Sequence, residues 1–316
     1  MRRGSLSDTK PGLQFLFTFF IILAGFLLFQ FISIITGLLI FRIPVSDAVT
    51  ILENLESEDT IPFMKYIQAL TSLGMFAVSA YISAWFFSKD PFDYLGLRKK
   101  SALSVIFLVV LLTLLTLPMN NYFTYLNNKL NLPDSMNWLQ TYFEDKELQM
   151  ERIMIKMLEG GGIIALLVNL IVIAVIPSLG EELLFRGVLQ KIFIHWTRSV
   201  HIGILITSFI FASFHFQFLS LLPRFVLGII LGYLFIYTAN LWIPIIMHFV
   251  NNALGVVYYH FYYIDKADKT LEKIGTPGNE LIYAFLSIII VLIIMFVIRR
   301  ISREKAKKIK VNSHQN

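Results

Sequence analysis

Two adjacent glutamates and an arginine stand in a stretch that otherwise reads as lipid-buried helix. Residues 177–187 are PSLGEELLFRG, and the residues before them are almost wholly apolar. An ionisable side chain at the bilayer centre costs about 2.5–3.5 kcal/mol even on the lenient insertion scale, so its presence there indicates function. On a helix Glu182 and Arg186 share a face, whereas Glu181 points about 100° away. Arg186 is therefore expected to neutralise Glu182 and to leave Glu181 able to accept a proton, unless the cluster is an ordinary ion pair at the membrane edge.

Two histidines and an asparagine occupy later apolar segments. His215 follows Phe211 by about one helical turn in FIFASFHFQF, and His248 and Asn252 are four residues apart in IPIIMHFVNNALG. A lone buried histidine is more often a core residue than a catalyst, but two of them, with an asparagine in register, are hard to explain by packing. A carboxylate base, imidazoles that polarise a water or stabilise an oxyanion, and a carboxamide donor together form a hydrolytic set.

The elements that must position these side chains are membrane helices. The chain of 316 residues is 56% hydrophobic and 15% charged, with a mean hydropathy of +0.69, which is too apolar for an ordinary soluble fold. In lipid every backbone polar group must be satisfied within its own segment. We therefore predict an all-α fold, a polytopic membrane helix bundle of about eight transmembrane helices that encloses a polar intramembrane cavity. The expected spans are roughly 13–40, 62–87, 101–118, 160–180, 201–220, 224–239, 241–262 and 281–298.

The chain divides into four parts on this basis. N-terminal transmembrane helices (1–118) precede an amphipathic interfacial segment (119–159), and the helices with the polar cluster (160–262) precede the last span and a basic tail (263–316). The segment 119–159 is expected to anchor the protein at the interface or, alternatively, to act as a lid that admits substrate.

The distribution of positive charge orients the bundle. Seventeen of the 27 Lys and Arg residues lie on one side if both termini face the cytoplasm, so we expect a multi-pass protein of the cell inner membrane with cytoplasmic termini. The basic tail is expected to face anionic lipid rather than nucleic acid. This topology places Glu181 near the cytoplasmic edge and His215 about 20 Å deeper. The two converge only if the helix of 160–180 continues through 182–196 or the next helix starts later than residue 201.

At these residues the chain resembles the CPBP intramembrane proteases, a family of CAAX prenyl proteases, bacteriocin-processing enzymes and Abi-like proteins. The family pattern Glu-Glu-x-x-x-Arg, Phe-x-x-x-His and His-x-x-x-Asn is matched by EELLFR at 181–186, FASFH at 211–215 and HFVNN at 248–252. The resemblance covers about 160–255.

The resemblance implies a role for each matched residue. Glu181 would activate the attacking water with help from His215. His248 and Asn252 would bind the water or the developing oxyanion. Supporting roles fall to the ion pair, Glu182 and Arg186.

Participation of a metal stays open at the level of sequence. One carboxylate and two imidazoles, from Glu181, His215 and His248, suit a divalent metal such as zinc with an open position for water. Family members are widely named metalloproteases, and a metal-free glutamate mechanism is also argued for them. We favour the metal-free mechanism, because Glu181 cannot easily be both a tight ligand and a base.

Other protease chemistries fit less well. The chain has no cysteine, none of its six histidines precedes a glutamate, and its aspartates fall outside the expected spans or at their ends. These facts exclude a thiol nucleophile, a His-Glu-x-x-His zinc protease and a diaspartyl enzyme. A serine–histidine dyad formed by Ser208 or Ser213 with His215 stays open.

The sequence therefore predicts an intramembrane endopeptidase that hydrolyses a peptide bond in a membrane-associated substrate. The resemblance implies a prenylated CAAX or bacteriocin-like peptide, so the expected partners are a membrane-bound peptide or lipidated protein and the lipid bilayer. Two alternatives come from other classes: a proton-coupled membrane transporter with a relay of buried Glu, His and Arg, and a non-catalytic immunity protein that binds a membrane peptide.

Overall fold

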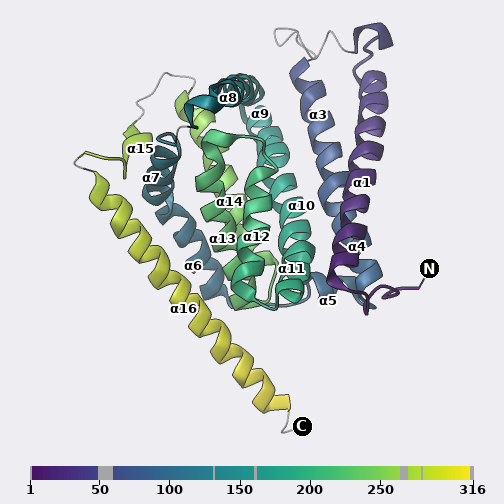
Figure 1. The fold of residues 1–316 in the computed structure, drawn as a ribbon, viewed down its shortest axis with the longest axis vertical. Coiled ribbons are helices and arrows are strands. Elements are labelled where there is room, and N and C mark those ends of the chain that lie inside the picture. Colours follow the sequence, from purple (N-terminus) through teal and green to yellow (C-terminus); the bar gives the residue numbers. More distant parts are fainter. Residues whose placement is uncertain are drawn as a thin grey trace.

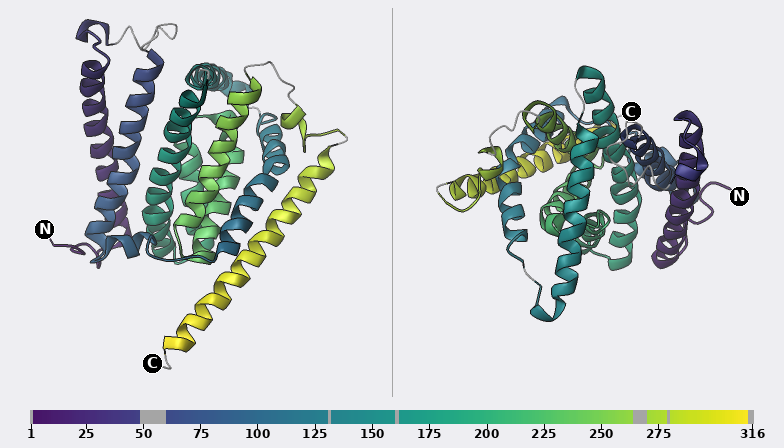
Figure 2. Two further views of the ribbon diagram at one scale, coloured as in Figure 1. Left: turned by 180° about the vertical axis from the view of Figure 1, so that it is seen from behind. Right: turned by 90° about the horizontal axis from the view of Figure 1, so that it is seen from above.

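The computed structural model describes residues 2–48, 60–130, 132–159, 162–263, 270–278 and 280–313, and every regular element in these ranges is helical. Figure 1 shows most of the helices running along one axis, with both marked ends of the chain at the same end of the bundle. Helix α8 (Asn137–Leu158) lies across the opposite end, as the view from above in Figure 2 shows. The predicted all-α polytopic bundle is confirmed.

The first helices form a hairpin beside the rest of the bundle. Helix α1 (Pro11–Ile40) packs against α3 (Thr60–Ser72) and α4 (Ser79–Phe87), which the π turn η2 (Leu73–Val78) joins into one long helix. A short helix, α5 (Pro91–Leu95), then runs along the end of the bundle where the termini lie (Figure 1).

The next two helices form a bent pair. Helix α6 (Leu103–Leu115) and helix α7 (Leu117–Asn127) meet at 43°. Pro118, in the first turn of α7, has no N–H to continue the hydrogen-bond ladder of α6, which accounts for the bend.

The second half of the chain supplies the centre of the bundle and its outer face. Its helices are α9 (Gly162–Asn169), α10 (Ile176–Leu184), α11 (Gln190–Thr197), α12 (Val200–Ser213), α13 (Leu221–Thr238), α14 (Trp242–Tyr258), α15 (Thr270–Lys273) and α16 (Leu281–Ser313). Helices α10 to α14 pack against one another, and α16 lies obliquely against α6, α7 and α13 (Figure 1).

Several helices have the length and apolar character of membrane spans. In the described residues these are Pro11–Ile40, Thr60–Phe87, Gly162–Thr197, Phe218–Thr238 and Leu281–Lys305, with the bent α6–α7 pair as a sixth. The chain is therefore an integral, multi-pass membrane protein. Helices α12 and α14, with 14 and 17 residues, run through the same bundle but are shorter, so the expected number of eight spans stays a prediction.

Two of the expected spans are wrong in extent. The span placed at 160–180 belongs to a continuous helix of 36 residues, Gly162–Thr197, so Glu181 lies near the middle of that helix and not at its edge. The span placed at 201–220 is interrupted, because α12 ends at Ser213 and Phe216 has a left-handed backbone with φ of 51°. His215 therefore lies in the turn after α12 rather than within a helix. Of the two ways in which the polar residues could converge, the continuation through 182–196 is the one the structure shows, since α12 begins at Val200 and not later than expected.

Close packing between α12 and α13 depends on a glycine. A Cβ atom placed on Gly228 of α13 would lie 2.9 Å from the Cβ of Ser208 on α12, closer than side chains approach one another. Small residues at helix contacts let backbones approach in this way inside a membrane. The same approach brings the carbonyl of Gly228 to the polar centre of the bundle.

Candidate active site

The helix that carries the two glutamates contains two π turns. The turn η4 (Leu170–Val175) precedes α10, and the turn η5 (Phe185–Leu189) follows it. Pro177, in the first turn of α10, lacks the N–H that a regular helix would use, which explains why the ladder widens just before it. Single π turns inside helices occur frequently at functional sites, and here they bracket Glu181 and Glu182.

Glu182 is the centre of a buried ion-pair network. Its Oε1 accepts a hydrogen bond of 2.8 Å from Nη1 of Arg186 and one of 2.9 Å from Nδ1 of His248. Glu182 and Arg186 have exposed fractions of 0% and 1%. The pairing expected from their i, i+4 spacing is thus present, and burial makes such charge-assisted bonds strong.

Arg186 also ties three helices together. Its Nη2 donates to the carbonyl of Gly228 over 3.1 Å, and its guanidinium carbon lies 4.6 Å from the centre of the Phe211 ring. A guanidinium over an aromatic face is attracted by the ring quadrupole, more strongly when both are desolvated. The arginine therefore holds α10, α12 and α13 in fixed relation to Glu182.

Glu181 has a different environment from its neighbour. Its Oε2 lies 4.0 Å from Nε2 of His248, is buried, and has no hydrogen-bond partner in the described part of the chain. A buried carboxylate oxygen without a partner costs free energy that a protein normally avoids. The arrangement leaves Glu181 available to a water or a substrate group at this position.

His248 connects the two carboxylates. Because Nδ1 donates to Glu182, the opposite nitrogen, Nε2, faces Glu181. A hydrogen bond on one imidazole nitrogen fixes the ring orientation and the tautomer. His248 is 3% exposed, so Nε2 is presented in a sheltered space.

The Phe211 ring lies between His215 and His248 and contacts both imidazoles. Its Nδ1 donates to the carbonyl of Phe211 over 3.1 Å, which leaves Nε2 as the acceptor in the neutral form. The Phe211 ring lies 5.3 Å from the His215 ring and 5.8 Å from the His248 ring, between centres. Among the described residues no hydrogen bond joins His215 to Glu181 or His248. Phe211 is therefore the contact that the two imidazoles share.

Asn252 is engaged with the helix of the glutamates. Its Nδ2 donates to the carbonyl of Ile173 in the π turn η4 over 3.3 Å, and its Oδ1 accepts from Nδ2 of Asn251 over 3.3 Å. A carboxamide has two N–H donors, so one bond to Ile173 leaves a second hydrogen for another acceptor.

Arg224, in the first turn of α13, lies outside the three sequence motifs. One of its terminal nitrogens donates to Oε1 of Gln217, and the other, Nη1, is buried without a partner in the described residues. Arg224 lies close enough to Glu181 and to Glu147 to interact electrostatically with both. The signal was present, because Arg224 is a charged residue in an apolar span, as Arg186 is.

The turn that carries His215 is held by the preceding segment of the chain. Glu147 of α8 accepts from the backbone N–H of Leu219 over 3.1 Å and from the hydroxyl of Ser220 over 2.7 Å. The rings of Phe143 and Phe218 are stacked with centres 5.1 Å apart. Asn127 of α7 donates to the carbonyl of Phe218 and accepts from the N–H of Leu222. Helix α8 therefore fixes the α12–α13 turn.

The positions of these side chains bear on whether the site could bind a zinc ion. The described residues hold no group of three or more His, Asp or Glu side chains placed to bind a metal ion, so Glu181, His215 and His248 do not form a ligand cluster. The arrangement of these residues does not fit a bound zinc ion, and we derive no step through one.

The comparisons with known proteins agree with the location of the site. Residues 163–254 match the family model described as Type II CAAX prenyl endopeptidase Rce1-like. The uncharacterized protein YpbD of Bacillus subtilis (strain 168) is 33% identical over 111 residues, which cover 33% of this chain and 54% of that protein. An uncharacterized 24.3 kDa protein of Escherichia coli is 31% identical over 115 residues, 35% of this chain and 53% of its own length.

The chain spans about half the length of the curated relatives it matches. No solved structure matches the chain at a significant level. The range matched by the family model contains both glutamates, both site histidines and Asn252. The part of this chain that is similar to the Rce1-like type II CAAX prenyl endopeptidases is therefore the part that contains the candidate site.

Proposed function

We propose that the protein is an intramembrane endopeptidase in which Glu181 is the general base. The observation that carries this proposal is the contrast between the two glutamates. Oε1 of Glu182 accepts hydrogen bonds from Arg186 and His248, although its Oε2 is buried without a partner in the described residues. The Oε2 of Glu181 is likewise buried without a partner there, lies 4.0 Å from His248, and belongs to a carboxylate that no arginine pairs with. A general base must reach the proton it abstracts, directly or through one water.

The proposed reaction is hydrolysis of one peptide bond. A water between Glu181 and His248 gives a proton to the Glu181 carboxylate, and its oxygen forms a bond to the carbonyl carbon. With both ring nitrogens protonated, His248 keeps Nδ1 on Glu182 and donates from Nε2 to the oxyanion, as does the remaining amide hydrogen of Asn252. As the C–N bond breaks, Glu181 returns the proton to the amide nitrogen, which leaves as an amine. His215 assists by orienting the water through Nε2.

The proposed substrate is a peptide that reaches the bundle from the membrane. Glu181 lies near the middle of a helix of 36 residues, so the scissile bond must enter the depth of the bilayer. The name of the matched family supports a lipidated or CAAX-type peptide, and a bacteriocin-like precursor or another membrane protein fits the same geometry. We place the protein in the cell inner membrane with cytoplasmic termini, because most of its Lys and Arg then lie inside.

A cleavage assay tests the proposal. The purified full chain in lipid is incubated with a panel of membrane peptides that includes farnesylated CAAX peptides, with and without a strong chelator. Wild type is expected to cleave at least one peptide in either condition, and Glu181→Gln is expected to cleave none while it keeps the wild-type circular dichroism spectrum.

The opposite results have distinct meanings. Cleavage by Glu181→Gln overturns the assigned base, and loss of wild-type cleavage in chelator overturns the metal-free mechanism. A proton flux across liposomes that depends on Glu181, with no peptide cut, would favour the transporter.

A further inference from the structure

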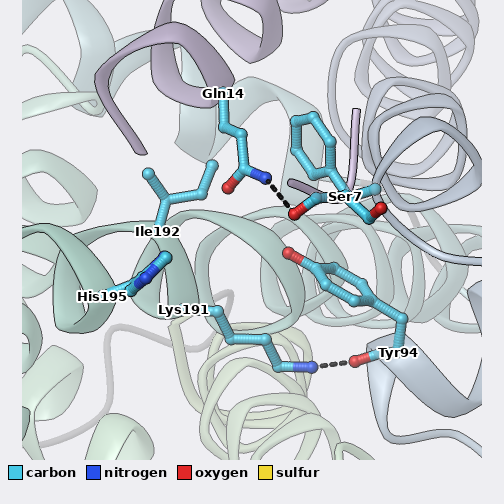
Figure 3. A pocket seen from close by; sticks show the side chains of 7 residues that line it. Ser7, Gln14, Tyr94, Lys191, Ile192 and His195 are labelled. Atoms are coloured by element: carbon cyan, nitrogen blue, oxygen red, sulfur yellow. Dashed lines mark hydrogen bonds between the residues drawn. The ribbon is translucent and has the colours of Figure 1, made fainter. Parts of the chain in front are cut away.

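A second polar site lies at the end of the bundle on the side of the chain termini (Figure 1). It is a cavity of about 240 Å³ lined by Ser7, Gln14, Phe87, Tyr94, Lys191, Ile192 and His195 (Figure 3). Water occupies about 30 Å³ per molecule in the liquid, so the cavity has room for a small polar group. Ser7 and His195 are exposed, which means that the cavity can be reached from the surface.

The polar groups of the cavity are mainly donors. Lys191 donates to the backbone carbonyl of Tyr94, and its ammonium lies 4.4 Å from the centre of the Tyr94 ring and 5.3 Å from that of Phe235. These contacts fix the ammonium but, among the described residues, give only one of its three N–H donors a hydrogen-bond acceptor. His195 follows Lys191 by four residues and lines the same cavity.

Hydroxyl groups complete the set. Figure 3 shows the Tyr94 hydroxyl pointing toward Ser7 and Gln14, across the cavity from the Lys191 ammonium. Burial raises the pKa of this hydroxyl, which keeps it protonated and able to donate. No carboxylate lines the cavity. Asp93 interacts electrostatically with Lys191, and Asp90 pairs with Arg98 over 3.2 Å.

One wall of the cavity is the N-terminal segment, residues 2–10. Its backbone donates from Gly4 to the carbonyl of Trp85 and from Leu6 to the carbonyl of Phe86. Gln14 donates to the carbonyl of Leu6 over 3.0 Å. This segment therefore packs in a defined position and holds Ser7 at the mouth of the cavity.

Tryptophans indicate the level of the cavity in the membrane. Trp85, Trp196 and Trp242 all stand at this end of the bundle, and Trp196 and Trp242 are 50% and 45% exposed. Exposed tryptophans gather where the membrane meets water, at the level of the lipid headgroups. Lys191 and His195 lie on the same helix as Trp196, within about one turn of it, so the cavity is at headgroup level.

We propose that this cavity binds the phosphate of an anionic phospholipid in the leaflet on the side of the chain termini. The lysine, the histidine and the two hydroxyls supply charge-assisted and neutral donors to the phosphate oxygens. Basic pockets between membrane helices bind anionic headgroups in this way. The lipid would join the N-terminal segment and α5 to α11, and its binding is independent of the proposed peptidase reaction.

Lipid binding can be measured on the full chain without any substrate. Native mass spectrometry in detergent counts bound lipid with phosphatidylglycerol, which has a net negative charge, or phosphatidylcholine, whose choline cancels the charge. Wild type is expected to retain one phosphatidylglycerol in preference to phosphatidylcholine. Lys191→Met keeps the aliphatic stem and is expected to weaken retention about tenfold, since it removes a charged donor.

Matched variants distinguish specific binding of the lipid in the cavity from non-specific attraction of the lipid to positive charge at this end of the protein. Lys100→Met removes an exposed charge at the same end that does not line the cavity, and it is expected to bind as wild type does. Tyr94→Phe removes only the hydroxyl and should weaken binding less than Lys191→Met, and His195→Gln provides a second test if Lys191→Met does not fold. Unchanged retention in the folded cavity variants, or equal loss in Lys100→Met, overturns the site.

The source of the phosphate is distinguished in a separate arm. Thermal unfolding of the lipid-free protein is followed with inorganic phosphate alone and with phosphatidylglycerol. A larger shift with the lipid supports the proposal. An equal shift with inorganic phosphate that disappears in Lys191→Met assigns the cavity to a soluble phosphate and overturns the lipid assignment.

Discussion

His248 donates from Nδ1 to Glu182 over 2.9 Å and presents Nε2 to Glu181 at 4.0 Å, so one imidazole lies between two adjacent carboxylates with unlike surroundings. The two glutamates are neighbours in sequence, but the helix points them in different directions. Glu182 is held in a buried ion pair, and Glu181 is the proposed general base. The predictions below follow from this division and from the contacts that maintain it.

Replacing Glu182 by glutamine is expected to lower the free energy of unfolding much more than replacing Glu181 by glutamine. Glu182→Gln leaves Arg186 buried without its counter-charge and should lower the free energy of unfolding by about 3–5 kcal/mol. Glu181→Gln loses no hydrogen bond to the described residues and should change it by less than about 1 kcal/mol. Thermal unfolding in detergent checks this, and equal stabilities of the two variants would contradict it.

The contact between α12 and α13 predicts the effect of a single methyl group. Gly228→Ala places a Cβ 2.9 Å from Ser208 and displaces the carbonyl that Arg186 uses, so it should destabilise the protein by about 1–3 kcal/mol. Gly255→Ala in α14 meets nothing within 4 Å and should stabilise the helix by up to about 1 kcal/mol. Denaturation of both variants tests the pair, and a stable Gly228→Ala protein would refute the close approach.

Arg224 is expected to contribute to catalysis through its charge. Arg224→Met removes a cation that interacts with Glu181, and we expect kcat/KM for peptide cleavage to fall about tenfold, equivalent to about 1.4 kcal/mol. Arg224→Lys keeps the charge and should recover part of the loss. Activity in Arg224→Met equal to wild type would show that this guanidinium has no part in the reaction.

Helix α8 is expected to influence activity through the His215 turn. Glu147→Ala removes both hydrogen bonds to Leu219 and Ser220, which should loosen that turn and lower kcat with little change in the midpoint of thermal unfolding. Glu151→Ala, one turn further along α8 on an exposed position, is the matched control and should behave as wild type. Equal activity in the two variants would leave α8 as an interface anchor alone.

The sequence predicted local geometry better than tertiary geometry. The Glu182–Arg186 pair follows from helical spacing, and it is present. The hydrogen bond from His248 to Glu182 joins residues 66 positions apart, so helical spacing could not predict it. The apolar pattern of 160–180 stops there because the charged residues of 182–196 lower the local hydropathy, although pairing and burial offset that cost in the folded helix. The break at Phe216 was missed because a left-handed phenylalanine has no sequence signal.

The two π turns have a consequence for how this helix tolerates change. Each π turn accommodates one residue more than a regular helix would, and one residue corresponds to about 100° of rotation about the axis. Deleting one residue within 185–189 would therefore change the π turn into a regular α turn and leave the helix beyond it facing as before. The π turn thus lets Lys191 and His195 lie beside Tyr94 although one additional residue separates them from Glu181.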